Sequence, residues 1–166
     1  ATLARQVAQA LDATGTDEVW EFGAGSGALA AQLLQALGDA VRRYSIVDLS
    51  GTLRLRQRER LARFGDRVRW LDELPEHIEG VVLGNEVLDA MPVQLLHFDG
   101  TPWFERGVAW QGGRFVFADR PTALRPPVDA PFVPGTTTEI HPQAQAFVRS
   151  LAERLHRGAA FFIDYG

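Results

Sequence analysis

The feature that most constrains this sequence is a short apolar run that leads into three glycines and then into a helical pattern. Residues 19–22 are apolar apart from one glutamate, Gly23, Gly25 and Gly27 follow, and apolar residues then recur at helical spacing. A buried strand, a glycine-rich turn and an amphipathic helix are typical of the first unit of an open α/β sheet. Ligands of such sheets bind beyond the carboxyl ends of the strands, where these glycines would lie.

Strand and helix patterns alternate through most of the chain. We expect helices from Leu3 to about Gly15, from Leu29 to Gly38, from Thr52 as the N-cap to Gly65, and from Ala144 to Gly158. We expect strands at residues 19–22, 44–49, 68–71, 81–83 and 159–163. Strands that alternate with amphipathic helices predict a parallel, doubly wound α/β sheet with helices on both faces and right-handed crossovers.

Residues 92–140 break this alternation, and we interpret them as a β-rich insertion. Short segments with aromatic residues are separated by Asp99-Gly100 and by Gly112-Gly113, which are turn signals for an antiparallel meander. The following stretch, residues 121–134, contains five prolines and predicts an extended loop.

Composition narrows the classes of function. The 166 residues include no cysteine and only four histidines, which lack ligand spacing, so we expect no metal site. The net charge of −4 and the lack of a basic tail argue against a nucleic-acid partner. No apolar run approaches the length of a membrane span and the N-terminus lacks the apolar core of a signal peptide, so we expect a cytoplasmic protein without membrane insertion.

The glycine loop by itself leaves two cofactors open. Gly23-x-Gly25-x-x-Ala28 satisfies the dinucleotide pattern GxGxxA, which would indicate an NAD-dependent oxidoreductase. Glu21, however, occupies a strand position that is usually apolar in dinucleotide folds, and its carboxylate suits the ammonium group of a methionine moiety. Asp48, at the end of the second strand, can accept hydrogen bonds from the ribose of either cofactor. Glu21 therefore favours S-adenosylmethionine, and a purely structural glycine turn is the alternative.

Acidic residues also follow the third and fourth strands. Asp72 either contacts the adenine amine or lies in a solvated loop. Glu86 and Asp89 are three residues apart, so both would lie on one side of a helical turn if one forms there. A pair of carboxylates suits a planar guanidinium and would aim one of its nitrogens at the transferable methyl group. The alternative is that these acids simply favour the first turn of a helix.

Several motifs together resemble the MidA family. The resemblance rests on EFGAGSGALAAQLL, YSIVDLSGTLRLRQRERL, GNEVLDAMPV, Glu105-x-x-Val108, the stretch from Pro134-Gly135 to Glu139, and FFIDYG, in that order. The family comprises bacterial proteins and mitochondrial complex I assembly factors that act as protein arginine methyltransferases. The resemblance implies a Rossmann-like class I methyltransferase fold, S-adenosylmethionine as cofactor, and a protein substrate, which is a respiratory complex I subunit for the mitochondrial members.

The resemblance also bears on individual positions. The glycine loop and the NEVLDA segment match the family, and Asp48 stands where family members commonly carry Glu. We expect cofactor contacts at Glu21, Gly23, Ala24, Gly25, Gly27, Asp48, Leu49 and Asp72, and catalysis by Asn85, Glu86 and Asp89. Asp164 and Tyr165, at the end of the last strand, either border the acceptor site or cap a loop.

Family proteins are considerably longer than this chain. They carry a segment ahead of the first helix and a region after Asp164-Tyr165-Gly166 that supplies the last strands of the sheet. We therefore expect residues 1–166 to form a single methyltransferase domain that is a fragment without those strands. Such a fragment would bind cofactor weakly or leave the acceptor pocket incomplete. A non-catalytic assembly factor that retains the fold is the alternative to an enzyme.

Overall fold

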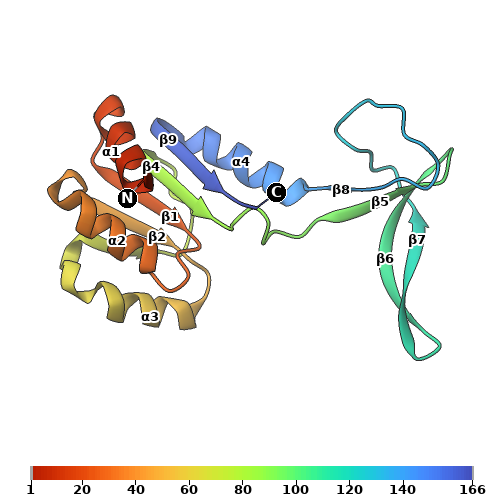
Figure 1. Ribbon diagram of the computed structural model, residues 1–166, viewed down its shortest axis with the longest axis horizontal. Coiled ribbons are helices and arrows are strands. Elements are labelled where there is room, and N and C mark those ends of the chain that lie inside the picture. The colour runs from red at the N-terminus through yellow and green to blue at the C-terminus, as the bar shows by residue number, and fades with distance from the viewer. Residues whose placement is uncertain (1, 166) are drawn as a thin grey trace. The chain divides into compact units, whose positions relative to one another are not determined.

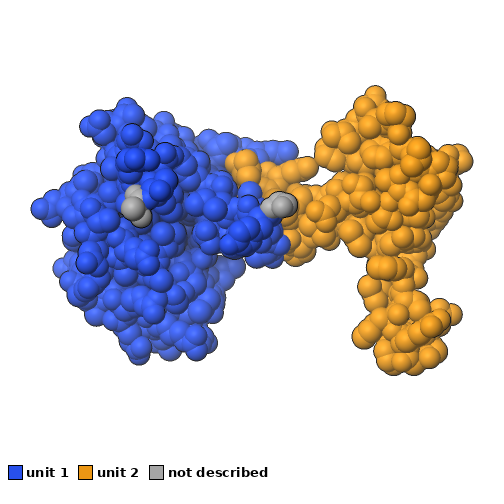
Figure 2. Space-filling model, viewed as in Figure 1, with its two compact units in different colours: residues 1–90, 149–166 blue, residues 91–148 orange. Residues whose placement is uncertain are grey.

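The computed structural model describes residues 2–165, which form two compact units (Figures 1 and 2). Unit 1 comprises Ala1–Ala90 and Arg149–Gly166, and unit 2 comprises Met91–Val148. Unit 1 contains a five-stranded sheet and unit 2 a four-stranded sheet. Gly166, which ends the FFIDYG motif, lies outside the described residues.

Helices and strands alternate along unit 1. Its elements are α1 (Thr2–Thr14), β1 (Glu18–Phe22), α2 (Ala28–Leu37), η1 (Gly38–Ala40), β2 (Arg43–Val47), α3 (Gly51–Leu61), η2 (Ala62–Arg67), β3 (Val68–Leu71), β4 (Ile78–Asn85) and β9 (Leu155–Ile163). The helix α4 (Pro142–Arg154) begins in unit 2, ends in unit 1 and leads directly into β9.

The sheet of unit 1 is parallel throughout, with the order β3-β2-β1-β4-β9 (Figure 1). The chain moves outward from β1 to β2 and β3, then returns to pair β4 with the other side of β1. Right-handed crossovers in these two opposite directions place the connecting helices on opposite faces of the sheet. The predicted α/β fold is confirmed, and the switch point of the sheet lies between β1 and β4.

Several element boundaries differ from those expected. Ser50, and not Thr52, caps α3, because the Ser50 hydroxyl oxygen accepts a hydrogen bond from the Leu53 N–H at 3.3 Å. Gly158 does not end α4 but lies inside β9, where a residue without a side chain lets β9 approach β4 closely. The strand β4 also extends beyond the three residues expected for it, because its pairing with neighbouring strands continues through polar positions.

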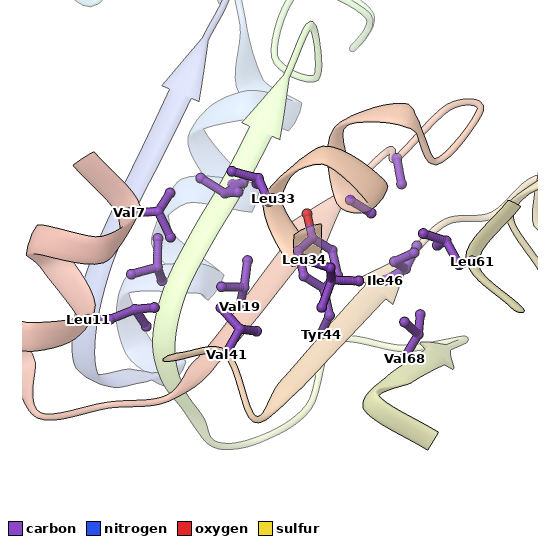
Figure 3. Close-up of a cluster of buried hydrophobic side chains, with 14 residues drawn as sticks. Val7, Leu11, Val19, Leu33, Leu34, Val41, Tyr44, Ile46, Leu61 and Val68 are labelled. Atoms are coloured by element: carbon purple, nitrogen blue, oxygen red, sulfur yellow. The ribbon is translucent and has the colours of Figure 1, made fainter. Parts of the chain in front are cut away.

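The core of unit 1 joins α1, α2 and α3 to the sheet (Figure 3). Its labelled members are all buried: Val7, Leu11, Val19, Leu33, Leu34, Val41, Tyr44, Ile46, Leu61 and Val68. Burial of a large apolar side chain contributes roughly 1.5–3 kcal/mol, so this cluster fixes the strand ends from which the loops depart. Tyr44 is the member with a hydroxyl group, which needs a hydrogen-bond partner at this depth.

Unit 2 is an antiparallel sheet with the order β7-β6-β5-β8. Its strands are β5 (Gln94–Phe98), β6 (Trp103–Gln111), β7 (Arg114–Pro121) and β8 (Thr137–Ile140). The two-residue turn Gly112-Gly113 has φ values of 58° and 79°, as a type I′ hairpin requires, so the predicted meander is confirmed. Trp103 packs in a small core with Leu96 and Ile140, whereas Trp110 is 65% exposed.

The strand β8 was not expected from the sequence. It pairs with β5 after the proline-rich loop, and its four residues are too few and too polar to give a periodic signal. None of the helices formed by residues 2–165 combines the length and apolar character that a bilayer span requires.

Candidate functional site

A pocket of about 510 Å³ lies beyond the carboxyl ends of β1 and β4, at the switch point of the sheet. It is lined by Glu21, Gly23, Ala24, Gly25, Leu29, Gln32, Asn85 and Glu86. Small-molecule sites typically enclose roughly 300–1,000 Å³. The structure therefore brings the predicted glycine loop together with two of the three predicted catalytic residues in a pocket of suitable size.

Glu21 places a buried carboxyl group against this pocket. Its side chain is 3% exposed, and its Oε2 accepts a hydrogen bond from the Tyr44 hydroxyl at 2.7 Å. Burial raises the pKa of Glu21 to about 7, the Tyr44 hydrogen bond opposes this rise, and the charge of Asp48 adds to it. Burial also raises the pKa of Tyr44 well above its ordinary value, so Tyr44 remains a neutral donor. A cation that reached Glu21 would stabilise its ionised form.

We expect the free energy of unfolding to decrease as the pH rises from about 4.5 to about 7. Glu21 has a pKa near 4.5 in an unfolded chain and about 7 here, so the folded state binds more protons between these values. The stabilisation is complete below the lower pKa and is lost as the pH rises through the upper one. The difference between these two pKa values corresponds to roughly 3 kcal/mol in the free energy of unfolding.

Urea unfolding at several pH values between 4.5 and 8 measures this dependence. The variant Glu21→Gln has no proton to lose at this position, so its stability should change less over the same range. Other groups titrate equally in both proteins, and the difference between the two curves isolates Glu21. Parallel curves for the two proteins would contradict the prediction.

Asp48 follows β2, and both of its carboxylate oxygens are held. Oδ1 accepts a hydrogen bond from the Ser50 N–H at 2.9 Å, and Oδ2 accepts one from Gln57 Nε2 at 2.7 Å. The same Gln57 nitrogen donates to the Gly25 carbonyl at 2.9 Å, and Gln57 Oε1 accepts from the Trp70 indole at 2.9 Å. Gln57 therefore connects the end of β2 to the glycine loop.

Sequence reasoning missed Gln57 as a functional residue. It stands at helical spacing from Leu53, Leu61 and Phe64, and this spacing alone predicts a side chain that faces the core. A glutamine on an otherwise apolar stripe was the available signal, because a buried amide needs partners for both of its ends. Gly27 makes room for this side chain, since a Cβ on Gly27 would stand 3.3 Å from Gln57 Cγ.

Glu86 and Asp89 lie in a loop that is hydrogen-bonded to the end of β9. Asp164 Oδ1 accepts hydrogen bonds from the N–H groups of Leu88 and Asp89 at 3.1 and 3.3 Å, and the Glu86 N–H donates to the Ile163 carbonyl at 2.8 Å. The helical turn on which the shared side of Glu86 and Asp89 depended does not form, because Glu86 has a φ of 55° and the segment forms a non-helical turn. Asp164 caps this loop.

The carboxyl group of Glu86 nevertheless interacts with that of Asp89. Partial burial raises the pKa of Glu86, and a hydrogen bond with Asp89 and the negative charges of Asp89 and Asp164 raise it further. Two neighbouring carboxyl groups resist simultaneous ionisation, so Glu86 takes up a proton more readily than an isolated glutamate does. A pair of this kind can also bind a cation with two donors.

Five of the expected site residues lie outside the lining of the pocket: Gly27, Asp48, Leu49, Asp72 and Asp89. Leu49 follows Asp48 and is 92% exposed. Asp72 is neither buried nor free, because its carboxylate pairs with the Arg54 guanidinium while 85% of its side chain stays exposed. Within residues 2–165 no group of three or more histidine, aspartate or glutamate side chains is arranged to hold a metal ion.

Unit 2 contains a pocket of its own, of about 560 Å³. It is bordered by Phe98, Trp103 and Phe132, which pack around the small core of that unit, and by the proline-rich loop. The charged Arg125 at its edge is bound to the carbonyls of Thr122 and Leu124. This pocket lacks the convergent polar groups of the switch-point pocket, which is therefore the better candidate for a chemical site.

Comparison with known proteins bears on this site. Residues 2–166 match a family described as "Putative S-adenosyl-L-methionine-dependent methyltransferase". A crystal structure of a Burkholderia thailandensis protein bound to S-adenosyl-homocysteine is 57% identical over 99% of this chain, with a TM-score of 0.86. A native structure of an uncharacterized protein from the same organism is also 57% identical over 99% of this chain, with a TM-score of 0.87.

The match covers only part of those two relatives. This chain spans 46% of the first and 47% of the second. No curated protein sequence is significantly similar to this chain.

Proposed function

Because this chain belongs to that family of putative S-adenosyl-L-methionine-dependent methyltransferases, we propose that it methylates a guanidinium nitrogen of arginine on a protein substrate. The observation that carries the proposal is the pocket in which the glycine loop and the buried Glu21 meet Glu86, the partner of Asp89. The S-adenosyl-homocysteine bound to a relative of 57% identity supports this cofactor over NAD.

The residues around the first strands fit the parts of the cofactor. Glu21, whose pKa is about 7, would ionise fully beside the ammonium group of the methionine moiety. A Cβ on Gly25 would meet no atom within 4 Å, so a nucleoside can approach the backbone there. Asp48 would accept hydrogen bonds from the ribose, the exposed Leu49 offers an apolar surface to adenine, and Asp72 offers a carboxylate to its amine.

The cofactor supplies an electrophilic methyl group, and the chain would orient and deprotonate the acceptor. The carboxyl groups of Glu86 and Asp89 would receive N–H groups of the guanidinium and turn one nitrogen toward the methyl group. The methylated nitrogen must lose a proton overall, and this carboxyl pair, in which the pKa of Glu86 is raised, is suited to accept it. Asn85 contributes an amide group to the same part of the pocket.

The resemblance to the MidA family supports an arginine of a respiratory complex I subunit as the acceptor. The hairpin of β6 and β7 supports a macromolecular substrate, because it exposes Trp110, Phe115 and Phe117 by 65%, 75% and 68%. Exposed apolar patches of this kind mark surfaces that bind other proteins. Trp103 is not available for such a role, since it is buried in the core of unit 2.

Transfer of a radiolabelled methyl group tests the proposal. Purified protein, labelled S-adenosylmethionine and isolated complex I subunits should give labelled protein, and mass spectrometry should place the label on arginine. Label on another residue type would overturn the arginine assignment. Tight binding of S-adenosyl-homocysteine without any transfer would favour a non-catalytic assembly factor, and binding of NADH in its place would overturn the cofactor assignment.

A further inference from the structure

We propose that Gln57 is the positioning residue for recognition of the cofactor ribose, and that it acts by fixing the carboxylate of Asp48. The inference rests on the ribose-binding role proposed above for Asp48. Gln57 lies in α3 and would contact neither the ribose nor the reacting atoms. Its effect would be on how strongly the protein prefers the nucleoside over an analogue that lacks a ribose hydroxyl.

The first step is the burial of Gln57. Its side chain is 0% exposed, and it is one of only two buried residues of α3, the other being Leu61. An amide group transferred from water to such a place destabilises the fold unless hydrogen bonds replace its water contacts. An apolar side chain of similar size would fill the same space without this cost, so the amide is present for the contacts that it makes.

The second step is the orientation of the amide, which is fixed by its three hydrogen-bond partners. The Gly25 carbonyl and the Asp48 carboxylate are acceptors, so they must face the Nε2 end, at 2.9 and 2.7 Å. The Trp70 indole N–H is only a donor, so it must face Oε1, at 2.9 Å. Flipping the amide would oppose like groups at all three contacts. The Trp70 contact, from β3, agrees with the orientation that Gly25 and Asp48 already require.

The third step is the effect on Asp48. Ser50 holds Oδ1 through a backbone N–H, and Gln57 holds Oδ2 through its side chain, so the plane of the carboxylate is fixed at both ends. Each oxygen retains acceptor capacity for a ribose hydroxyl, because a carboxylate oxygen accepts more than one hydrogen bond. Since the same amide nitrogen also binds the Gly25 carbonyl, the ribose acceptor and the glycine loop are held in one fixed relation.

Calorimetric titration with S-adenosyl-homocysteine and with its 2′-deoxy analogue tests this inference. The unchanged protein should prefer the ribose form by about tenfold or more, the effect of a hydrogen bond to a charged group. Gln57→Met should bind S-adenosyl-homocysteine about tenfold more weakly and lose most of this preference. In turnover assays its KM for S-adenosylmethionine should rise while kcat changes little.

Two further variants keep the test decisive. Gln57→Leu fills most of the same space with neither a donor nor an acceptor, so it too should lose the preference. Trp70→Phe removes the hydrogen bond to Gln57 Oε1 and alters the contact with Arg58, but it leaves the hydrogen bond from Gln57 to Asp48 and so serves as a folding control. It should retain most of the preference for the ribose form.

The outcomes separate this inference from the proposed function. If both Gln57 variants keep the full preference for ribose, or weaken both nucleosides by the same factor, Gln57 has only a structural role and the inference is wrong. If Asp48→Asn leaves the preference unchanged, the ribose role of Asp48 is wrong and the inference falls with it. If the unchanged protein binds neither nucleoside, the proposed cofactor itself is wrong.

Discussion

Replacing Glu86 by glutamine is expected to lower kcat for methyl transfer by about 10²- to 10³-fold, the range of effects seen when a proton acceptor is removed from an active site. Glutamine can still accept a hydrogen bond from a guanidinium, but it cannot take up a proton or carry a negative charge. The pKa of Glu86 is raised by partial burial and by Asp89, so the wild-type pair is the better acceptor. Affinity for S-adenosyl-homocysteine should change by less than about threefold, because Asp48 and Glu21 are unaltered.

Initial rates at saturating cofactor and calorimetric titration measure these two quantities. Glu79→Gln is the matched control, because Glu79 is a surface carboxylate whose partner is Arg157 and it takes no part in the proposed site. Glu86 also has an unusual backbone conformation, with a φ of 55°. Equal losses of kcat and of cofactor affinity in Glu86→Gln would show that Glu86 holds the loop and does not act on the substrate.

Replacing Gly158 by alanine is expected to destabilise unit 1 by about 4 kcal/mol or more, which is beyond the range of most single substitutions. Gly158 has a φ of 149°, which side chains rarely adopt, and a Cβ there would overlap the backbone carbonyl of Gly80 in the neighbouring strand. Neither backbone can move alone, because Gly80 is itself so close to the carbonyl of Glu18 in β1 that a Cβ on Gly80 would overlap it. The substitution would therefore disturb three adjacent strands.

Urea unfolding followed by circular dichroism measures this effect. Gly51→Ala provides the control, because Gly51 lies in the first turn of α3 and a Cβ there would meet no atom within 4 Å. Its stability should stay the same or rise by up to about 1 kcal/mol, since alanine restricts the unfolded chain. A Gly158→Ala protein as stable as this control would show that β4 and β9 are not packed as closely as described.

Features that depend on neighbouring residues were predictable from the sequence. The glycine loop, the alternation of strands and helices, and the Gly112-Gly113 hairpin all rest on local conformational preferences that tertiary packing did not override. The cap of α3 was misplaced by two residues, because Ser50 and Thr52 are both suitable N-caps and only the fold selects between them.

Features that depend on distant partners were not predictable. The contacts of Gln57 come from the glycine loop, from β3 and from the end of β2, so its role emerges only when these elements meet. The interaction of Glu86 with Asp89 was inferred from their spacing in a helical turn, and that turn does not form. The two residues come together instead in a turn whose backbone N–H groups are bound by Asp164. Gly158 was taken for a helix terminus because its function, close contact with Gly80, lies across the sheet.

The hydrogen bonds between the Glu86–Asp89 loop and the end of β9 also make the acid pair depend on a distant part of the chain. The nucleoside half of the pocket draws on residues up to Asp72, whereas the carboxyl loop gains its anchors only from Ile163 and Asp164. Asp164 lies 76 residues beyond the first backbone group that it holds. Loss of these anchors would free the carboxyl loop while the contacts of Asp48 with Ser50 and Gln57 remain, so separate parts of the chain order the acid pair and the ribose site.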